Sequence, residues 1–178
     1  TDANDSPVIT SAASASVAEN ATAVTTVTTT DADMPAQNIT YSITGGADAG
    51  LFSINSGSGA LTFTSGRDFE SPTDAGADNV YNVQVTATDD GGSPASTNQT
   101  IAVTVTDVNE APTITSGATV SVAEEQTAVS TVTATDADSG QTLAYSLTAG
   151  AGDDDNAVFS INSSTGVLAF LSSPDYET

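Results

Sequence analysis

The sequence predicts an all-β protein built from tandem seven-stranded, immunoglobulin-like Greek-key sandwiches, the second of which is incomplete at its C-terminal end. Three observations lead to this fold class. Short segments alternate apolar residues with hydroxyl or other polar residues, which is the period of a half-buried strand. Sequences rich in Gly, Asp, Ser and Pro separate these segments, as expected of turns. The whole pattern then recurs along the chain, which indicates repeated domains.

Short motifs fix the length of the repeat. Pro7-Val-Ile-Thr10 recurs as Pro112-Thr-Ile-Thr115, an offset of 112 − 7 = 105 residues. A unit of this length suits a single domain. We therefore expect four segments: a linker from a preceding repeat at 1–6, a first repeat at 7–106, a second linker at 107–111 and a partial second repeat at 112–178.

The alternating segments give the expected strands. In the first repeat they lie at residues 14–18, 23–29, 39–43, 52–54, 60–63, 80–87 and 100–105. The second repeat is expected to contain counterparts of the first five, ending at residues 167–170, and to lack the last two. A sandwich without those two strands exposes its core and a sheet edge, so we expect further residues or a partner chain to fill the gap.

Composition excludes several classes of function. The chain has one Arg, no Lys and no His against 23 Asp and Glu residues, a net charge of −22. Such a field repels nucleic acid and anionic membrane surfaces, so neither is an expected partner. There is no Cys, hence no disulfide, and no apolar run reaches the roughly 20 residues of a membrane span. Without His, Cys or Lys, and with no serine nucleophile motif, we do not expect an enzyme.

Many of the acids lie in short motifs that recur with the repeat, mostly at strand ends. The acidic joint Asp107-Val-Asn-Glu-Ala-Pro112 also occurs at the start of the chain, as Asp2-Ala-Asn-Asp-Ser-Pro7. Crowded carboxylates repel one another unless a cation binds, and calcium accepts six to eight irregularly placed oxygen ligands. Zinc would require His or Cys. The recurring acids are Asp2, Asp5, Glu19, Asp31, Asp33, Asp68, Glu70, Asp89, Asp107, Glu110, Glu124, Asp136, Asp138, Asp175 and Glu177.

The remaining acids receive a simpler interpretation. Acids such as Asp48, Asp74, Asp78, Asp90 and Glu125 belong to none of the recurring ligand motifs. Acidic side chains are mostly solvent-exposed in globular proteins. We therefore interpret these as solvated surface residues.

Taken together, the motifs resemble the cadherin repeat in its bacterial cadherin-like form. They are Val-Ala-Glu-Asn/Glu, Asp-Ala-Asp, Asp-Phe/Tyr-Glu, Ala-Thr-Asp and Asp-x-Asn-Asp/Glu-x-Pro, and the resemblance covers essentially the whole chain. It implies calcium bound by the base of one repeat, the linker and the top of the next repeat. Carried over to the central joint, the implied ligands are Glu19, Asp68, Glu70, Asp107, Asn109, Glu110, Asp136 and Asp138, with backbone carbonyls near Val108 and Ala111.

The resemblance also implies ligands at the two outer ends. Those facing a preceding repeat are Asp2, Asn4, Asp5, Asp31, Asp33 and Asp89, and those facing a following repeat are Glu124, Asp175 and Glu177. The sequence departs from the family pattern at Phe69 and Tyr176, where a basic residue is usual, and at Glu110, where Asp is usual. The absence of Trp gives no support to strand-swapped adhesion.

These expectations lead to a functional hypothesis. We expect a calcium-rigidified rod or stalk segment of an extracellular bacterial surface adhesin or filament, whose partners are neighbouring repeats and other copies. One alternative is a carbohydrate-binding module attached to a polysaccharide-degrading enzyme, with glycans as partners. Such a module needs an exposed aromatic platform, whereas Tyr41, Phe52, Phe63 and Tyr81 fall at core-like positions. Another alternative is a self-assembling fibre whose incomplete second repeat is completed by a neighbouring copy.

Overall fold

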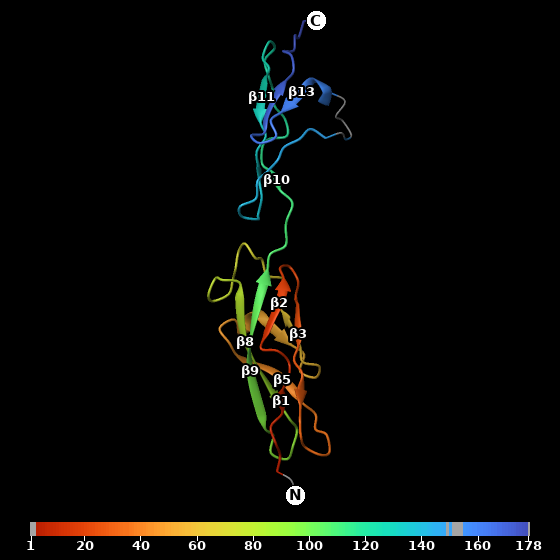
Figure 1. The fold of residues 1–178 in the computed structure, drawn as a ribbon, viewed down its shortest axis with the longest axis vertical. Coiled ribbons are helices and arrows are strands. Elements are labelled where there is room, and N and C mark those ends of the chain that lie inside the picture. Colours follow the sequence, from red (N-terminus) through yellow and green to blue (C-terminus); the bar gives the residue numbers. More distant parts are fainter. Residues whose placement is uncertain (1–2, 149, 151–154, 178) are drawn as a thin grey trace. The chain divides into compact units, whose positions relative to one another are not determined.

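The computed structural model describes residues 3–148, 150 and 155–177, and the chain divides into two compact units, residues 1–108 and 109–178 (Figure 1). Each unit is described by itself below. The described residues form strands and two single-turn 3₁₀ helices, η1 (Ala49–Leu51) and η2 (Asn156–Val158). None of these helices is long and apolar enough to cross a membrane.

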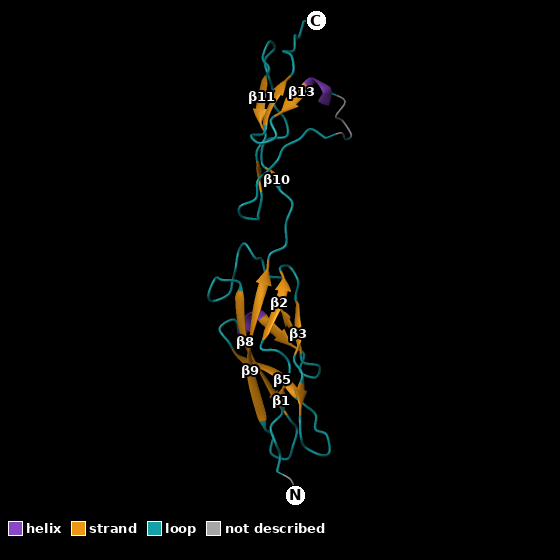
Figure 2. Ribbon diagram, viewed as in Figure 1, coloured by secondary structure: helices purple, strands orange, loops and turns teal. Residues whose placement is uncertain are grey.

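The first unit is a two-layered β-sandwich (Figure 2). One layer is a four-stranded sheet in the order β2-β9-β8-β5, and the other is a three-stranded sheet in the order β3-β7-β6. A short antiparallel pair, β1 with β4, adds to these layers. The strands are β1 (Val8–Ile9), β2 (Ser14–Ala18), β3 (Ala23–Thr26), β4 (Thr29–Thr30), β5 (Thr40–Gly45), β6 (Phe52–Ile54), β7 (Ala60–Phe63), β8 (Val80–Thr88) and β9 (Ser96–Thr106).

The predicted all-β sandwich is confirmed, with two local differences. The segment predicted at 23–29 forms two strands, β3 and β4, and a short strand, β1, precedes the first predicted one. The N-terminal segment therefore contributes two strands. β1 pairs with β4, and β2 runs parallel beside β9. The other strand pairs are antiparallel.

The core lies between the two sheets of the first unit. Strand β8 alternates half-buried and buried positions along its whole length, so every second side chain points inward. Leu61 is 1% exposed, and the ring of Phe63 stacks on Phe52 and meets Tyr81 edge-on, with centroids 4.5 and 5.2 Å away. The core positions predicted for Phe52, Phe63 and Tyr81 are confirmed, and Tyr41 packs against the same core.

The described residues of the second unit form the three-stranded sheet of the sandwich but not the four-stranded one. Its described strands are β10 (Thr113–Ile114), β11 (Ala128–Thr131), β12 (Ala134–Thr135), β13 (Phe159–Ile161) and β14 (Val167–Phe170). β10 pairs with β12, and β11, β14 and β13 form a sheet that matches β3-β7-β6. The expectation of five strands equivalent to those of the first unit is therefore wrong at residues 119–123 and 143–147, which form no strand.

The reason lies in the pairing partners. In the first unit the corresponding strands, β2 and β5, are held by β9 and β8. The counterpart of Val80, where β8 begins, would fall at about 80 + 105 = 185, after Thr178. An alternating sequence alone cannot form a sheet without a neighbour that supplies backbone hydrogen bonds.

The inner face of the second unit is consequently open. A hollow of about 370 Å³ lies over it, lined mainly by apolar residues that include Ile114, Leu143, Tyr145 and Leu168. Ile114 is 67% exposed. In the first unit, residues of β8 and β9 cover the equivalent face.

Charge is absent from the sheets. None of the strands from β1 to β14 in the described residues contains an Asp, Glu or Arg residue. Hydroxyl pairs link neighbouring chain segments instead, such as Thr44 with Thr86 at 2.7 Å and Thr115 with Thr133 at 3.0 Å. All 23 acids of the sequence therefore lie outside these strands.

The two units offer a matched test of packing. Leu61 on β7 is 1% exposed, whereas its counterpart Leu168 on β14 is only half-buried. We expect Leu61→Ala to lower the free energy of unfolding of the first unit by about 2–5 kcal/mol, because it leaves a cavity in a closed core. Leu168→Ala should cost the second unit less, because solvent already reaches that side chain. Hydrogen exchange, read separately for each unit, measures both; equal losses would contradict the open face.

Candidate metal centre

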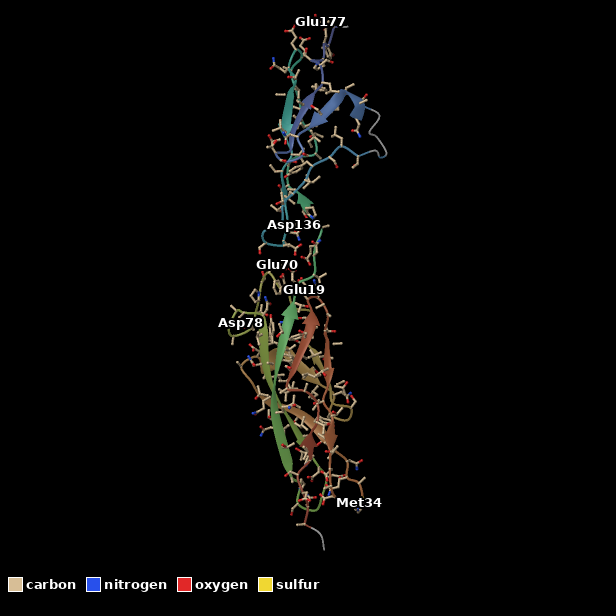
Figure 3. All side chains as sticks on the ribbon, viewed as in Figure 1. Glu19, Met34, Glu70, Asp78, Asp136 and Glu177 are labelled. Atoms are coloured by element: carbon tan, nitrogen blue, oxygen red, sulfur yellow. The ribbon has the colours of Figure 1, made fainter. Side chains whose placement is uncertain are left out.

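The carboxylates of the first unit gather where β2 and β9 end. These strands are parallel, and Ala18 lies opposite Thr106, so Glu19 and Asp107 leave the sheet at the same edge. The Glu19 N–H donates to the Thr106 carbonyl at 2.9 Å. One carboxylate oxygen from each of Glu19, Glu70 and Asp107 lies within 4.8 Å of the others, and Figure 3 shows Glu19 and Glu70 together at this end of the unit.

Glu19 organises this cluster. It is only 5% exposed, yet both of its oxygens are hydrogen-bonded. Oε1 accepts the N–H of Val108 at 2.9 Å and Oε2 accepts the N–H of Phe69 at 3.2 Å. A buried carboxylate is costly unless it is hydrogen-bonded or paired. Glu19 therefore ties the segment after β9 to the Asp-Phe-Glu loop.

The pKa of Glu70 is raised by its place in this cluster. Partial loss of hydration raises the pKa of Glu70, and the negative charges of Glu19, Asp107 and Asp68 raise it further, against a lowering by its own backbone N–H. The neighbouring like charges therefore add to the loss of hydration in disfavouring the ionised form of Glu70.

The loop that carries Asp68 and Glu70 is held by neutral contacts. Arg67 lies over the Phe63 ring at 5.6 Å, and its guanidinium donates to the Ser65 carbonyl and to Thr73 Oγ1. Within the described residues, these hydrogen bonds of the only basic side chain in the sequence go to uncharged oxygens.

Two acids outside the recurring motifs also shape this loop. The interpretation of Asp48 and Asp74 as solvated residues is wrong, because they are 5% and 6% exposed. Asp48 accepts the N–H groups of Ala75 and Asn82, both at 2.7 Å. Burial acts to raise the pKa of Asp74, but backbone N–H groups, chiefly those of Asp78 and Asn79, outweigh it and hold the pKa below its usual range.

A second cluster lies at the opposite end of the first unit, near Met34 in Figure 3. Asp31 follows β4 and Asp89 follows β8. The Asp5 N–H donates to Asp33 Oδ2 at 2.9 Å, the Asp33 N–H donates to Asp31 Oδ1 at 3.0 Å, and Asn4 Nδ2 donates to Asp89 Oδ2 at 3.1 Å. The predicted ligand Asp2 lies outside the described residues.

This second cluster also contains an unsatisfied oxygen. Asp31 Oδ2 is buried and has no hydrogen-bond partner. Burial acts to raise the pKa of Asp89, but the N–H groups of Ala95 and Gly91 and the Asn4 amide hold it below the usual range. A Cβ at residue 91 would displace the Asn4 side-chain amide from its present position.

The second unit reproduces the same arrangement with its own residues. The Glu110 N–H donates to Asp138 Oδ2 at 3.0 Å, and the Asp138 N–H donates to Asp136 Oδ1 at 3.1 Å. Asp138 is 6% exposed, and its Oδ1 is buried without a hydrogen-bond partner. Buried acceptors without donors in both units suit a cation as their missing partner.

The other end of the second unit repeats the Glu19 arrangement. Glu124 Oε2 accepts the N–H of Tyr176 at 3.3 Å, as Glu19 accepts that of Phe69, and the Glu177 N–H donates to Asp175 Oδ1 at 3.0 Å. Asp136 and Glu177 lie at opposite ends of this unit (Figure 3). The candidate metal ligands at these clusters are carboxylate, amide and carbonyl oxygens, which are the ligands that calcium prefers.

An immunoglobulin-like sandwich, followed by a second unit that repeats one of its sheets, defines the class of protein, together with the acids gathered at the ends of both units. The cadherin-domain profile matches residues 13–106, more than half of the chain. The chain is 37% identical over 161 residues to mouse Protocadherin Fat 4, which covers 86% of this chain and 3% of that protein. The chain belongs to the cadherin family.

Solved structures agree with this assignment. The chain is 26% identical to mouse Cadherin-23 EC22-24, with a TM-score of 0.63 over 98% of this chain and 56% of that one. It is also 26% identical to Protocadherin gammaB7 EC3-6, described as a cis-dimer, with a TM-score of 0.58 over 98% of this chain and 46% of that one. The chain thus spans only part of the relatives that it matches.

Family membership carries several general properties. Cadherin domains are extracellular, tandemly repeated adhesion modules and not enzymes, and they generally bind calcium. Cadherin repeats interact with neighbouring repeats and with other copies. The relatives reported above are animal proteins, so they give no support to the bacterial form of the family that the sequence suggested.

The opposite pKa shifts of two acids predict opposite effects of pH in EDTA. The raised pKa of Glu70 means that its folded-state stabilisation is present below its unfolded-state pKa and is lost as pH rises through the folded-state value. Glu70→Gln should therefore raise Tm at neutral pH but not at about pH 3.5, where Glu is largely protonated. Equal gains at both pH values would contradict this account.

Asp89 provides the reverse control for the same measurement. Its lowered pKa stabilises the fold above its unfolded-state pKa, and this contribution is lost as pH falls through the folded-state value. Asp89→Asn should therefore lower Tm at neutral pH, and the loss should shrink in acid.

Proposed function

We propose that this chain is a calcium-rigidified rod or stalk segment of a surface adhesin or filament, with calcium held where consecutive repeats join. The observation that carries the proposal is the cluster of Glu19, Glu70 and Asp107, in which three oxygens lie within 4.8 Å of one another. Partial loss of hydration raises the pKa of Glu70, and the neighbouring negative charges raise it further. A divalent cation would convert this repulsion into attraction.

The proposed ligands follow the recurring motifs. Bound calcium would neutralise the carboxylates and would be coordinated by their oxygens. At the central joint we assign Glu19, Asp68, Glu70, Asp107, Asn109, Glu110, Asp136 and Asp138, with the carbonyls of Val108 and Ala111. At the outer ends we assign Asp2, Asn4, Asp5, Asp31, Asp33 and Asp89 toward a preceding repeat, and Glu124, Asp175 and Glu177 toward a following one.

The chain's own residues support this assignment in each unit separately. Glu19 accepts the N–H groups of Val108 and Phe69. These hydrogen bonds would fix the start of the linker and the Asp-Phe-Glu loop before a cation binds. On the other side of the joint, the Asp138 carboxylate fixes the backbone of Glu110 and keeps one buried oxygen free of hydrogen bonds. Preorganised oxygens of this kind lower the cost of binding.

The composition of the chain suggests the setting of the parent protein. The absence of Cys and Lys and the many Thr and Ser residues favour a bacterial surface adhesin or filament, built of many such repeats. The carbohydrate-binding alternative receives no support, because Phe52, Phe63 and Tyr81 are buried and form no exposed platform in the first unit.

Calcium affinity tests the ligand assignment. Asp107→Asn should weaken binding at least about tenfold in calorimetric titration, because affinity at oxygen sites depends on the number of charged ligands. The control is Asp155→Asn, which makes the same charge change at an exposed residue whose side chain caps no helix. It should bind as the wild type does. Equal weakening by both variants would indicate diffuse charge attraction and no defined site.

Calcium should also change the stability and the hydrodynamics of the chain. A ligand that binds only the folded state at 100 times its Kd adds about 2.7 kcal/mol of stability, so Tm should rise on adding millimolar calcium. If the joint is clamped, the distribution of end-to-end distances measured by fluorescence transfer between labels on the two units should narrow. Addition of EDTA should reverse both effects, and a distribution that does not respond to calcium would refute the clamp.

A further inference from the structure

We propose that Gln37 and Gln141 are positioning residues of the calcium sites, each tying a linker Asn to the second Asp of the Asp-Ala-Asp motif. This inference rests on the proposed function. Neither glutamine belongs to the recurring acidic motifs. Both act on residues that the proposed function names as calcium ligands.

The contact is the same in both units. Gln37 Nε2 donates to Asn4 Oδ1 at 2.8 Å and to Asp33 Oδ2 at 3.0 Å. Gln141 Nε2 donates to Asn109 Oδ1 at 2.7 Å and to Asp138 Oδ2 at 2.9 Å. In each unit one amide nitrogen therefore joins two separate segments, the linker and the loop that carries the Asp-Ala-Asp motif.

The repetition is not a by-product of identical backbones. Gln37 follows Asp33 by 4 residues, whereas Gln141 follows Asp138 by 3. The linker Asn lies 33 residues before the glutamine in the first unit and 32 residues before it in the second. Two loops of different length thus bring the same side chain to the same pair of oxygens.

The direction of each amide is fixed by its neighbours. Asn4 uses its Nδ2 to donate to Asp89, and Asn109 uses its Nδ2 to donate to the Glu110 carbonyl, so in both cases Oδ1 faces the glutamine. A carboxylate and an amide oxygen can only accept, so the glutamine must present its N–H groups. Gln37 Oε1 is buried without a hydrogen-bond partner, so the N–H bonds alone set the orientation.

This geometry assigns a role beside the metal and not on it. The nitrogen holds Asn109 Oδ1 and Asp138 Oδ2 near one another before a cation arrives. Asp138 Oδ2 also accepts the Glu110 N–H, so the buried Oδ1 of the same carboxylate is the oxygen that stays open to a cation. Residues that hydrogen-bond to metal ligands and orient them typically affect metal affinity 10–100-fold. We therefore expect the glutamine to set the affinity of the site through the positions of its ligands.

Gln141→Met tests the clamp, because Met has a similar length and no N–H donors. Gln126→Met is the matched control, since Gln126 is an exposed glutamine of the same unit. In the wild-type chain, calcium titration should show binding. In the Gln141→Met variant it should be weakened about tenfold or more, and in Gln126→Met it should be unchanged. Gln37→Met should act likewise on the site of the first unit.

A second readout needs no metal. In EDTA, ¹⁵N relaxation of the Asn109 side-chain amide should show an ordered group in the wild type and in Gln126→Met, and a mobile one in Gln141→Met. Wild-type affinity in Gln141→Met would overturn the clamp while leaving calcium binding intact. Failure of the wild-type chain to bind calcium would instead overturn the proposed function, and with it any role of Gln141 toward calcium.

Discussion

The parallel pairing of β2 with β9 is the constraint on which the site depends. Because Ala18 lies opposite Thr106, the next residue of each strand, Glu19 and Asp107, emerges at the same edge of the sheet. A sandwich in which the first strand stayed with β4 alone would separate these two acids. The crossing of the N-terminal segment from β4 to β9 thus turns distant sequence motifs into one cluster.

Much of this arrangement could be predicted from repeated motifs, because a motif that recurs at a strand end marks a position that each unit uses in the same way. Asp48 had no such mark: its partners Ala75 and Asn82 lie 27 and 34 residues away, and only the fold brings them together. The strand predicted around Tyr145 does not form, for the opposite reason. Its segment alternates like a strand, but a strand also needs a neighbour, and sequence pattern reports only one side of that pair.

The distribution of pKa shifts shows how the unit manages its acids without bases. Asp74 and Asp89 face backbone N–H groups, which stabilise their anions and lower their pKa values despite burial. Partial loss of hydration, together with the neighbouring carboxylates, raises the pKa of Glu70. The Arg67 guanidinium donates to the Ser65 carbonyl and to Thr73 Oγ1. Acids that accept backbone N–H groups therefore stabilise the fold, whereas Glu70 belongs to the cluster that we propose as a calcium site.

The uncharged strands have a consequence for colloidal behaviour. Edge strands of soluble proteins commonly carry lysine or another charge that discourages pairing with a foreign chain, but the edges β5 and β6 carry none. Separation of one copy from another must then rely on the long-range field of the acids in the loops. Whatever neutralises those loops, whether protons or divalent ions, also removes the barrier that keeps bare sheet edges of different molecules apart.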